Sequence, residues 1–411
     1  MTATTVAPES LDTIDLADPK LHAEHDLSEI WRHLRATRPV YWQPLRGTQP
    51  GFWAITRYAD ALSVYRDSDR FTTERGNALG TILHGGDSAA GVMLAVTDGT
   101  RHHEIRAILQ RAFSARALAA IGESLRRTVD RLLTEAIDKG ECDFARDVAG
   151  NVPLGAICDL LDVPQDDRRY LLSLTAHAWS SDHADAPPID SWSARNEILL
   201  YFADLSKVRQ RSSRTDVVSL LTNATIGGDN LRDAELVANC YGLMIGGDET
   251  GRHAISGGLQ ALLDHPDEWR RLKDGEAGLA SGAEEVLRWT TPSIHSGRAA
   301  TVDVTVGGEQ IHAGDAVSVW ISSANRDETV FPDPDRFDLN RDPNKHLTFA
   351  LGSHFCLGHL LGRMEVEAVL EGLRRRVRSV RQTGPAQRIY SSVLSGLSSL
   401  PVVLEPEPAR S

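Results

Sequence analysis

Helical periodicity is the feature that most limits what this chain can fold into. Apolar residues recur at helical spacing through most of residues 58–297. The longest breaks are the Gly-rich region Gly76–Gly91 and the Pro-bearing segment Ser180–Asp190, whose residue types favour loops. The chain is therefore predicted to be mainly α-helical.

Strand-like alternation of apolar and polar residues is confined to two short regions. Residues 39–57 are typical of two strands joined by a Gly/Pro turn, and residues 302–321 are typical of a small antiparallel sheet. No repeat, charged tail or low-complexity linker divides the 411 residues. We therefore expect a single domain over residues 1–411, with a flexible N-terminal segment at residues 1–25.

Composition and charge exclude several classes of partner. With 41% hydrophobic and 25% charged residues, the chain is typical of a globular protein. Its net charge of −13 argues against nucleic acid or an anionic membrane as the main partner. No apolar run is long enough to span a bilayer, and the polar, acidic N-terminus lacks the order of a signal peptide. These features predict a cytoplasmic protein with no nucleic-acid or membrane partner.

The segment Leu231–Asp264 combines helical periodicity with many glycines. Each glycine inside a helix costs about 0.8 to 1 kcal/mol relative to alanine. Close packing against another helix explains Gly257 and Gly258. The run GGDET at residues 246–250 instead leaves one turn bare beside an acid and a hydroxyl. It is explained either by close packing or by a flat molecule that approaches the backbone.

A single cysteine, Cys356, lies in a loop between Gly352 and Gly358, just before residues with helical spacing. A helix N-terminus and nearby loop N–H groups stabilise a thiolate, the form of cysteine that binds metal or attacks a substrate. The other three cysteines are scattered, and the sequence has neither paired metal-ligand spacing nor a CxxCH motif. From this loop alone, Cys356 is a buried core residue, a nucleophile or a metal ligand.

The wider pattern separates these alternatives. Residues 349–358 form F-x-x-G-x-H-x-C-x-G, which strongly resembles the haem-ligand loop of the cytochromes P450. Further motifs that resemble this family are D-x-x-x-H-x-x-x-R at 98–106, GGDET at 246–250, E-x-x-R at 285–288 and PDPDRF at 332–337. The resemblance spans at least residues 39–403. It implies the cytochrome P450 fold, mainly α with a small antiparallel β region, and haem b held by the thiolate of Cys356.

The resemblance also implies which residues surround the haem. Phe349 would pack near the sulfur side of the ring, while Gly352 and Gly358 would shape the loop. The haem propionates are anionic and need donors when they are buried. The donors at matching positions are His102, Arg106, Arg298 and His354, with His346 as a structural donor nearby.

On the opposite side of the ring, Glu249 and Thr250 match the family's acid–alcohol pair. Thr250 would hold dioxygen and an ordered water, and Glu249 would help to bring protons from solvent. The bare backbone at Gly246 and Gly247 would leave room for oxygen and substrate. Gly251 departs from the pattern, because many relatives carry Thr, Ser or Ala there. This departure bears on the coupling of the enzyme, that is, the fraction of electrons consumed that yields product.

A charged cluster is implied on the proximal side. Glu285 and Arg288 lie three residues apart on one helix face, and Arg336 in PDPDRF matches the family's third charged partner. Breaking such a buried cluster costs about 3 to 5 kcal/mol. The predicted role of these three residues is therefore structural.

The substrate pocket is expected to include the loops at residues 76–95 and 180–192. Polar residues in the segment TPSIHS suit an oxygenated polyketide or peptide-like natural product better than a fatty acid. The predicted substrate contacts are Leu243, Gly246, Ser293, Ile294, His295 and Leu394.

Electrons are expected from ferredoxin and a ferredoxin reductase, because the sequence shows no fused flavin or iron–sulfur domain. Arg363 with Arg374–Arg376 could form a basic dock, although a solvated helix end is the favoured explanation of those arginines. The chain is thus predicted to be a P450 monooxygenase that uses O2 to hydroxylate or epoxidise a small substrate of secondary metabolism, such as an antibiotic intermediate. The alternatives are a P450 that catalyses coupling, ring closure, desaturation or peroxide-driven oxidation, a haem sensor, and a cysteine hydrolase.

Overall fold

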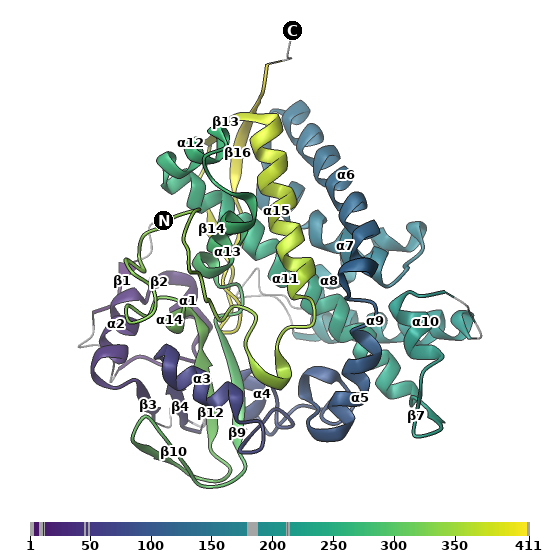
Figure 1. Ribbon diagram of the computed structural model, residues 1–411, viewed down its shortest axis with the longest axis vertical. Coiled ribbons are helices and arrows are strands. Elements are labelled where there is room, and N and C mark those ends of the chain that lie inside the picture. The colour runs from purple at the N-terminus through teal and green to yellow at the C-terminus, as the bar shows by residue number, and fades with distance from the viewer. Residues whose placement is uncertain are drawn as a thin grey trace.

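The computed structural model describes residues 4–7, 11, 13–44, 47, 50–178, 188–210, 212 and 214–408 (Figure 1). The predicted break at Ser180–Asp190 and the pocket loop expected at residues 180–192 lie for the most part outside these residues. None of the described helices is both long and apolar enough to cross a membrane.

Helices dominate the described chain. The α-helices are α1 (Pro19–Glu24), α2 (Ser28–Thr37), α3 (Tyr58–Arg66), α4 (Leu79–Leu83), α5 (Gly99–Leu109), α6 (Ala115–Lys139), α7 (Asn151–Leu160), α8 (Arg168–Ala178), α9 (Pro188–Arg209), α10 (Val217–Thr222), α11 (Asp233–Asp264), α12 (Pro266–Asp274), α13 (Leu279–Thr290), α14 (Ile321–Ala324) and α15 (His359–Arg376). Short 3₁₀ or π-helical turns are η2 (Leu94–Val96), η3 (Phe144–Ala149), η4 (Gln165–Asp167) and η5 (Gly352–His354). The prediction of a mainly helical chain is confirmed.

The strands are short and gather in small sheets. They are β1 (Thr4–Thr5), β2 (His25–Asp26), β3 (Val40–Gln43), β4 (Phe52–Ile55), β5 (Phe71–Thr72), β6 (Glu141–Asp143), β7 (Thr225–Ile226), β8 (Asp229–Asn230), β9 (His295–Ala300), β10 (Val304–Val306), β11 (Glu309–Ile311), β12 (Ala316–Trp320), β13 (Val377–Gln382), β14 (Gln387–Arg388), β15 (Leu397–Ser399) and β16 (Pro401–Pro406). The largest sheet has the order β3-β4-β12-β9-β5 and lies in the lower left of Figure 1. Within the region predicted as one antiparallel sheet, β10 and β11 form an antiparallel hairpin of their own, whereas β12 joins the largest sheet, antiparallel to β9 and parallel to β4. The pairs β3-β4 and β5-β9 are antiparallel.

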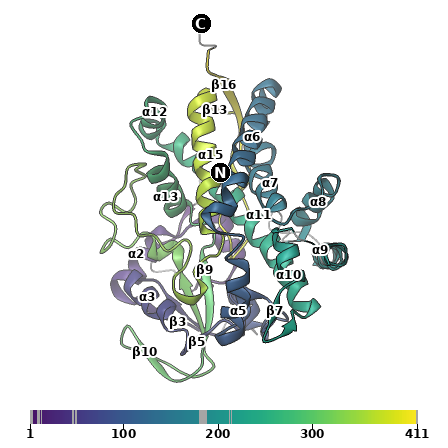
Figure 2. The same ribbon diagram turned by 45° about the vertical axis from the view of Figure 1, so that its right-hand side comes forward.

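The long helix α11 passes through the helical core, where it packs against α7, α9, α13 and α15 (Figures 1 and 2). It begins where the N–H of Arg232 donates to Glu235 at 3.0 Å, and Pro266 opens the next helix. A Cβ at Gly257 would lie 2.9 Å from Thr290, and one at Gly258 would lie 2.8 Å from Val286. These two glycines therefore let α11 pack closely against α13, as the sequence indicated.

Helix α15 follows directly on the cysteine loop and runs beside α6 (Figure 2). It contacts α11 and α13 as well, so the loop at its N-terminal end is supported by the largest core cluster. This packing fixes the position of the loop relative to α11.

The first 25 residues contribute to a second core cluster. Leu11, Leu16 and Leu21 are buried there with Trp31 and Trp320. The flexible segment at residues 1–25 and the single domain over residues 1–411 stay predictions, although these three leucines are anchored in the fold.

Candidate functional site

A cavity of about 470 Å³ lies between α11 and the cysteine loop. Its wall is built by residues from α5, α11, β9, the cysteine loop and the turn before β15. The predicted site residues that line it are His102, Arg106, Leu243, Gly246, Glu249, Thr250, Ser293, His295, Arg298, Phe349, His354, Cys356, Gly358 and Leu394. The fold thus brings most of the predicted site together around one space.

Two predicted site residues do not line the cavity. Gly352 shapes the loop from outside, with a φ of +77° and a backbone so close to α3 that a Cβ would lie 2.1 Å from the carbonyl oxygen of Tyr65. Ile294 is 4% exposed and packs in the second core cluster with Trp320, so the structure does not bring it to the cavity wall, and its role as a substrate contact stays a prediction. It follows the cavity-lining Ser293 along an extended segment, where adjacent side chains point to opposite faces.

The loop places the sulfur of Cys356 in the cavity wall. The N–H of Cys356 donates to the carbonyl of Phe349 at 2.9 Å, which closes the loop. Burial raises the pKa of the Cys356 thiol, while the Gly358 N–H and the guanidinium groups of Arg106 and Arg363 act to lower it. These groups are the ones that would stabilise a thiolate at this sulfur.

The other three cysteines lie in apolar surroundings. Cys142, Cys158 and Cys240 are buried in the largest core cluster, and none of them lines the cavity. Burial raises the pKa of Cys142 to about 11 and that of Cys158 to about 12. In the described part of the chain, Cys356 is thus the cysteine placed to act as a ligand.

Donors without anionic partners surround the cavity near the loop. Arg298 on β9 is 5% exposed, and its Nη1 donates to the carbonyl of Gly297 at 2.7 Å. Arg106 donates to the carbonyl of Phe355 at 2.6 Å. Neither arginine forms an ion pair with a described carboxylate, and the buried Nε2 of His102 has no hydrogen-bond partner among the described residues. Buried donors left unused in this way fit a cofactor with anionic substituents, as the propionates of haem would be.

His354 is held by Asp98, the first residue of the D-x-x-x-H-x-x-x-R motif. Its Nε2 lies 2.6 Å from the carboxylate of Asp98, and its ring centre lies 4.3 Å from that of His102. Burial lowers the pKa of His354 more than Asp98 raises it. The pKa of His102 falls to about 4, because it is buried and stands beside His354 and Arg106.

The middle of α11 carries the predicted acid–alcohol pair. The hydroxyl of Thr250 donates to the carbonyl of Gly246 at 2.9 Å, one turn back along the helix. Glu249 is 3% exposed, with Arg252 Nη2 at 3.3 Å and His253 Nε2 at 3.5 Å from its Oε2. Burial acts to raise the pKa of Glu249, but His253 and Arg252 outweigh burial and hold this pKa below its usual value.

Two further buried acids were missed by the sequence reasoning. Glu365 lines the cavity from α15, and burial raises its pKa well above the usual value. Asp248 precedes Glu249, and burial together with the negative charge of Glu249 raises its pKa to about 7. A Cβ at Gly251 would lie 2.6 Å from Glu365 Oε2 and 2.8 Å from Pro153, so this glycine leaves room for the buried acid. The sequence carries one signal for Glu365: this acid lies at helical spacing from Leu361 and Ala368, on the face of the helix where apolar residues indicate burial.

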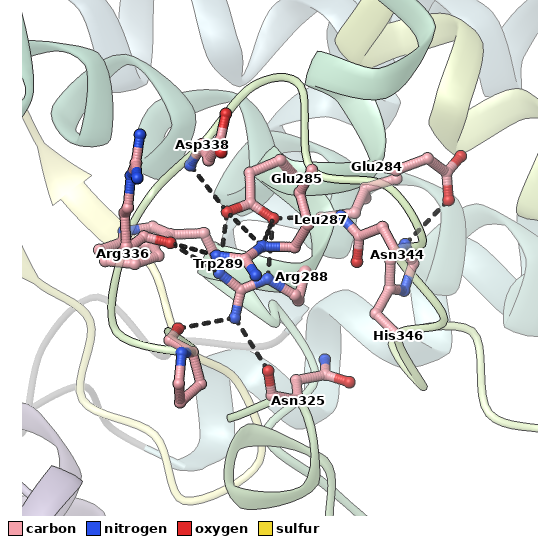
Figure 3. Close-up of polar contacts among 12 residues, drawn as sticks. Glu284, Glu285, Leu287, Arg288, Trp289, Asn325, Arg336, Asp338, Asn344 and His346 are labelled. Atoms are coloured by element: carbon pink, nitrogen blue, oxygen red, sulfur yellow. Dashed lines mark hydrogen bonds and ion pairs between the residues drawn. The ribbon is translucent and has the colours of Figure 1, made fainter. Parts of the chain in front are cut away.

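The predicted charge cluster around Glu285 is present, but one of its three predicted members is replaced by another arginine (Figure 3). Arg288 donates to both oxygens of Glu285 at 2.8 Å, and both residues are fully buried. Arg341, not Arg336, is the third charged partner, since its Nε donates to the two oxygens at 3.2 and 3.1 Å. Arg336 contributes only its backbone carbonyl, and Figure 3 shows its side chain directed away from the cluster. The Nε2–H of His346 donates to the carboxylate of Glu284 at 3.0 Å, in agreement with a structural role.

The arginines considered as a dock are dispersed. Arg363 pairs with Glu284 close to the cysteine loop. Arg374–Arg376 instead lie at the opposite end of α15, where Arg375 and Arg376 both pair with Asp130. A patch at that end lies about 20 Å or more from the loop, given the rise of an α-helix. The helix-end explanation of this cluster is therefore favoured.

Comparisons with known proteins agree along the whole chain. A family model described as Cytochrome P450 matches residues 281–385. Cytochrome P450 NovI of Streptomyces niveus is 63% identical over 401 residues, which are 98% of this chain and 98% of that protein. A Steroid C26-monooxygenase of Mycobacterium tuberculosis is 32% identical over 96% of this chain and 98% of its own length. The crystal structure of P450 OxyD, which is involved in the biosynthesis of vancomycin-type antibiotics, matches 96% of this chain and all of its own, with a TM-score of 0.88 and 33% identity.

The family-model match includes the cysteine loop and the charge cluster, and the matches to NovI and OxyD leave only 2% and 4% of the chain uncovered. Members of this family hold haem through a cysteine thiolate, which agrees with the free thiol and the unused donors at this cavity. The chain belongs to the cytochrome P450 family and is a haem-dependent monooxygenase.

Proposed function

We propose that Cys356 is the thiolate ligand of the haem and that the cavity beside it holds the substrate. The observation that carries this proposal is that the sulfur of Cys356 and the Glu249–Thr250 pair line one cavity from opposite elements. A haem with a thiolate ligand supplies the chemistry of dioxygen activation and the transfer of one oxygen atom to a substrate.

Buried donors orient the cofactor in this proposal. Arg298, Arg106 and His102 would donate to the propionates, because each presents polar hydrogens to the cavity without a described anionic partner. His354, fixed by Asp98, would support His102 through their ring contact. Phe349 lines the cavity next to the loop and would cover the sulfur side. Gly352 and Gly358 give the loop its shape.

Proton supply is the task of α11. The Thr250 hydroxyl is anchored to the Gly246 carbonyl, so its oxygen faces the cavity in a fixed orientation as an acceptor and relay for a proton. Glu249, buried and kept ionised by Arg252 and His253, would take up protons from the outside and pass them towards Thr250. The presence of both groups favours oxygen activation over a peroxide-driven route.

The substrate is proposed to be an oxygenated natural product of polyketide or peptide-like character. Leu243, Gly246 and Leu394 offer apolar contacts, while Ser293 and His295 add polar groups to the same wall. The involvement of OxyD in antibiotic biosynthesis supports this class. The oxidation would be a hydroxylation or epoxidation, with coupling, ring closure or desaturation as the alternative outcome of the same site.

Electrons are proposed to come from a separate ferredoxin and its reductase, in the cytoplasm. The four cysteines are free thiols, which suits a reducing compartment. We place the dock near the cysteine loop rather than at Arg374–Arg376. The exposed Arg111 and Arg116 flank Phe113, which lies next to Gly358, and could attract an acidic partner there.

The role of the acid–alcohol pair is tested with the Thr250→Ala variant. Loss of the hydroxyl should leave haem content and substrate-induced spin shifts unchanged, while product formed per NADPH consumed falls about tenfold. The measurement uses a surrogate ferredoxin system and a substrate found by spin-shift screening. A product-to-NADPH ratio equal to that of the parent would mean that Thr250 is only a helix residue.

A further inference from the structure

The proposed function uses His253 only for its effect on the charge of Glu249, and does not explain why the imidazole is completely buried. It lies one helical turn after Glu249 and is 0% exposed, with its Nε2 at 3.5 Å from Glu249 Oε2. A buried imidazole costs free energy unless its nitrogens are used, so its place beside a buried carboxylate calls for a reason. Arg252 also approaches this carboxylate, at 3.3 Å, and is partly exposed.

The second observation is the segment that covers His253. Gly396, just before β15, packs so closely on the imidazole that a Cβ there would lie 2.1 Å from Nδ1 and 2.2 Å from Cγ of His253. The segment is held in place, since Ser395 N–H donates to the Pro292 carbonyl at 2.8 Å and Ile389 N–H to the Gly396 carbonyl at 3.2 Å. The imidazole is therefore clamped between the backbone at Gly396 and the carboxylate of Glu249.

We propose that His253 is a positioning residue for Glu249, and that the absence of a side chain at Gly396 makes room for the imidazole. This inference rests on the proposed role of Glu249 in proton supply. The clamped imidazole fixes which rotamer Glu249 adopts and holds its carboxyl in the ionised form, ready to accept a proton. The segment that carries Gly396 also lines the cavity through Val393 and Leu394. The imidazole of His253 therefore connects the wall of the substrate cavity with Glu249.

The charges around Glu249 agree with this arrangement. Asp248 on α11 is a buried acid whose pKa is raised by burial and by the charge of Glu249, and Glu365 on α15 is a buried acid whose pKa is raised by burial and by Asp248. Arg252 and His253 are the groups on α11 that favour the ionised carboxylate, and they lower its pKa against the effect of burial. Removing the imidazole should therefore raise the pH at which Glu249 takes up a proton.

The test compares variants of the whole haem-loaded protein by infrared spectroscopy. Difference spectra on photolysis of the reduced carbon monoxide adduct are recorded over a range of pH, and the Glu249 carboxyl band is the one that Glu249→Gln removes. The pH at which this band reaches half of its full intensity is the titration midpoint of Glu249. In His253→Leu and Gly396→Ala, this midpoint should rise by about one pH unit, a tenfold change in the ionisation equilibrium. His253→Gln, which restores an amide N–H near the place of Nε2, should bring the midpoint back towards that of the parent.

Gly384→Ala is the matched control, because an added Cβ there would meet nothing nearer than Pro401 at 3.4 Å. It should leave the midpoint unchanged. A midpoint in His253→Leu equal to that of the parent overturns the inference, even if that variant loses thermal stability. The proposed function has a separate test. If Glu249→Gln keeps the parent's product-to-NADPH ratio, Glu249 has no role in proton supply. The shift of the titration midpoint in His253→Leu would remain an independent measurement.

Discussion

Arg341 donates from its Nε to both carboxylate oxygens of Glu285, at 3.2 and 3.1 Å. Glu285 is fully buried and also receives two bonds from Arg288 and one from the N–H of Asp338. Its charge is thereby matched by two guanidinium groups and a backbone donor, which is the condition for a buried carboxylate to remain ionised. The cluster joins α13 to the irregular segment that leads to the cysteine loop.

The first prediction separates Arg341 from Arg336. Arg341→Leu should destabilise the protein by about 1.5 to 3 kcal/mol, because Glu285 loses charged hydrogen bonds in a buried site. Arg336→Leu removes an exposed side chain and should change stability by less than about 0.5 kcal/mol. Thermal unfolding of the two variants measures the difference. Equal losses would show that the side chain of Arg336 contributes to the cluster in solution.

This exchange of arginines shows where prediction from sequence ends. The helices follow from periodicity, which fixes side-chain direction within a regular element. The cysteine loop and the pairs Glu285–Arg288 and Glu249–Thr250 were implied by the resemblance of their motifs to the cytochromes P450. Arg336 lies in an irregular segment, where spacing says nothing about direction, and the side chain of Arg341 reaches the acid instead. The contact between Gly396 and His253 joins residues far apart in the sequence, so no local pattern could reveal it.

The second prediction concerns the loop glycines. Gly352→Ala should prevent the loop from closing, because the new Cβ would lie 2.1 Å from the Tyr65 carbonyl oxygen at a φ of +77°. The expected result is a protein with little bound haem, measured as haem per chain after purification. Gly80→Ala is the control, since its Cβ would meet nothing within 4 Å and Gly80 does not line the cavity. A Gly352→Ala protein with full haem content would contradict the close approach to Tyr65.

The third prediction contrasts two buried arginines. Arg298→Leu should weaken haem retention about 10- to 100-fold while the fold persists, because one charged hydrogen bond to a propionate contributes about 1.5 to 3 kcal/mol. Arg288→Leu should instead give misfolded or haem-free protein, because it leaves Glu285 with one charged partner fewer in the core. Haem transfer to apomyoglobin and far-UV circular dichroism distinguish the two. If Arg298→Leu keeps its haem as tightly as the parent, Arg298 does not hold a propionate.

The fourth prediction is a pH dependence set by Asp248. Burial raises its pKa to about 7 from the ordinary value of 3.8, so the folded protein retains a proton that the unfolded chain releases. Stability from this group is therefore present at low pH and is lost as pH rises through about 7. Asp248→Asn removes that loss, so its Tm relative to the parent should be higher at pH 8 than at pH 5. The corresponding difference in the free energy of unfolding should be on the order of 2 to 4 kcal/mol.

The surface variant Asp204→Asn serves as the control for this pH dependence, because Asp204 is exposed and paired with Lys207 at the surface. Its Tm relative to the parent should be the same at both pH values. An Asp248→Asn variant that behaves in the same way would show that Asp248 is ionised in the folded protein throughout this range.

The central claim is that Cys356 holds the haem iron, and the absorbance spectrum of the reduced, carbon-monoxide-bound protein tests it most directly. Thiolate donates more charge to iron than a hydroxyl or imidazole does, so the parent should show the thiolate-type band. Cys142→Ser, Cys158→Ser and Cys240→Ser should keep that band, since these thiols lie in the core away from the cavity. Cys356→Ser and Cys356→His should lose it. A thiolate-type band that survives in Cys356→Ser would contradict the account.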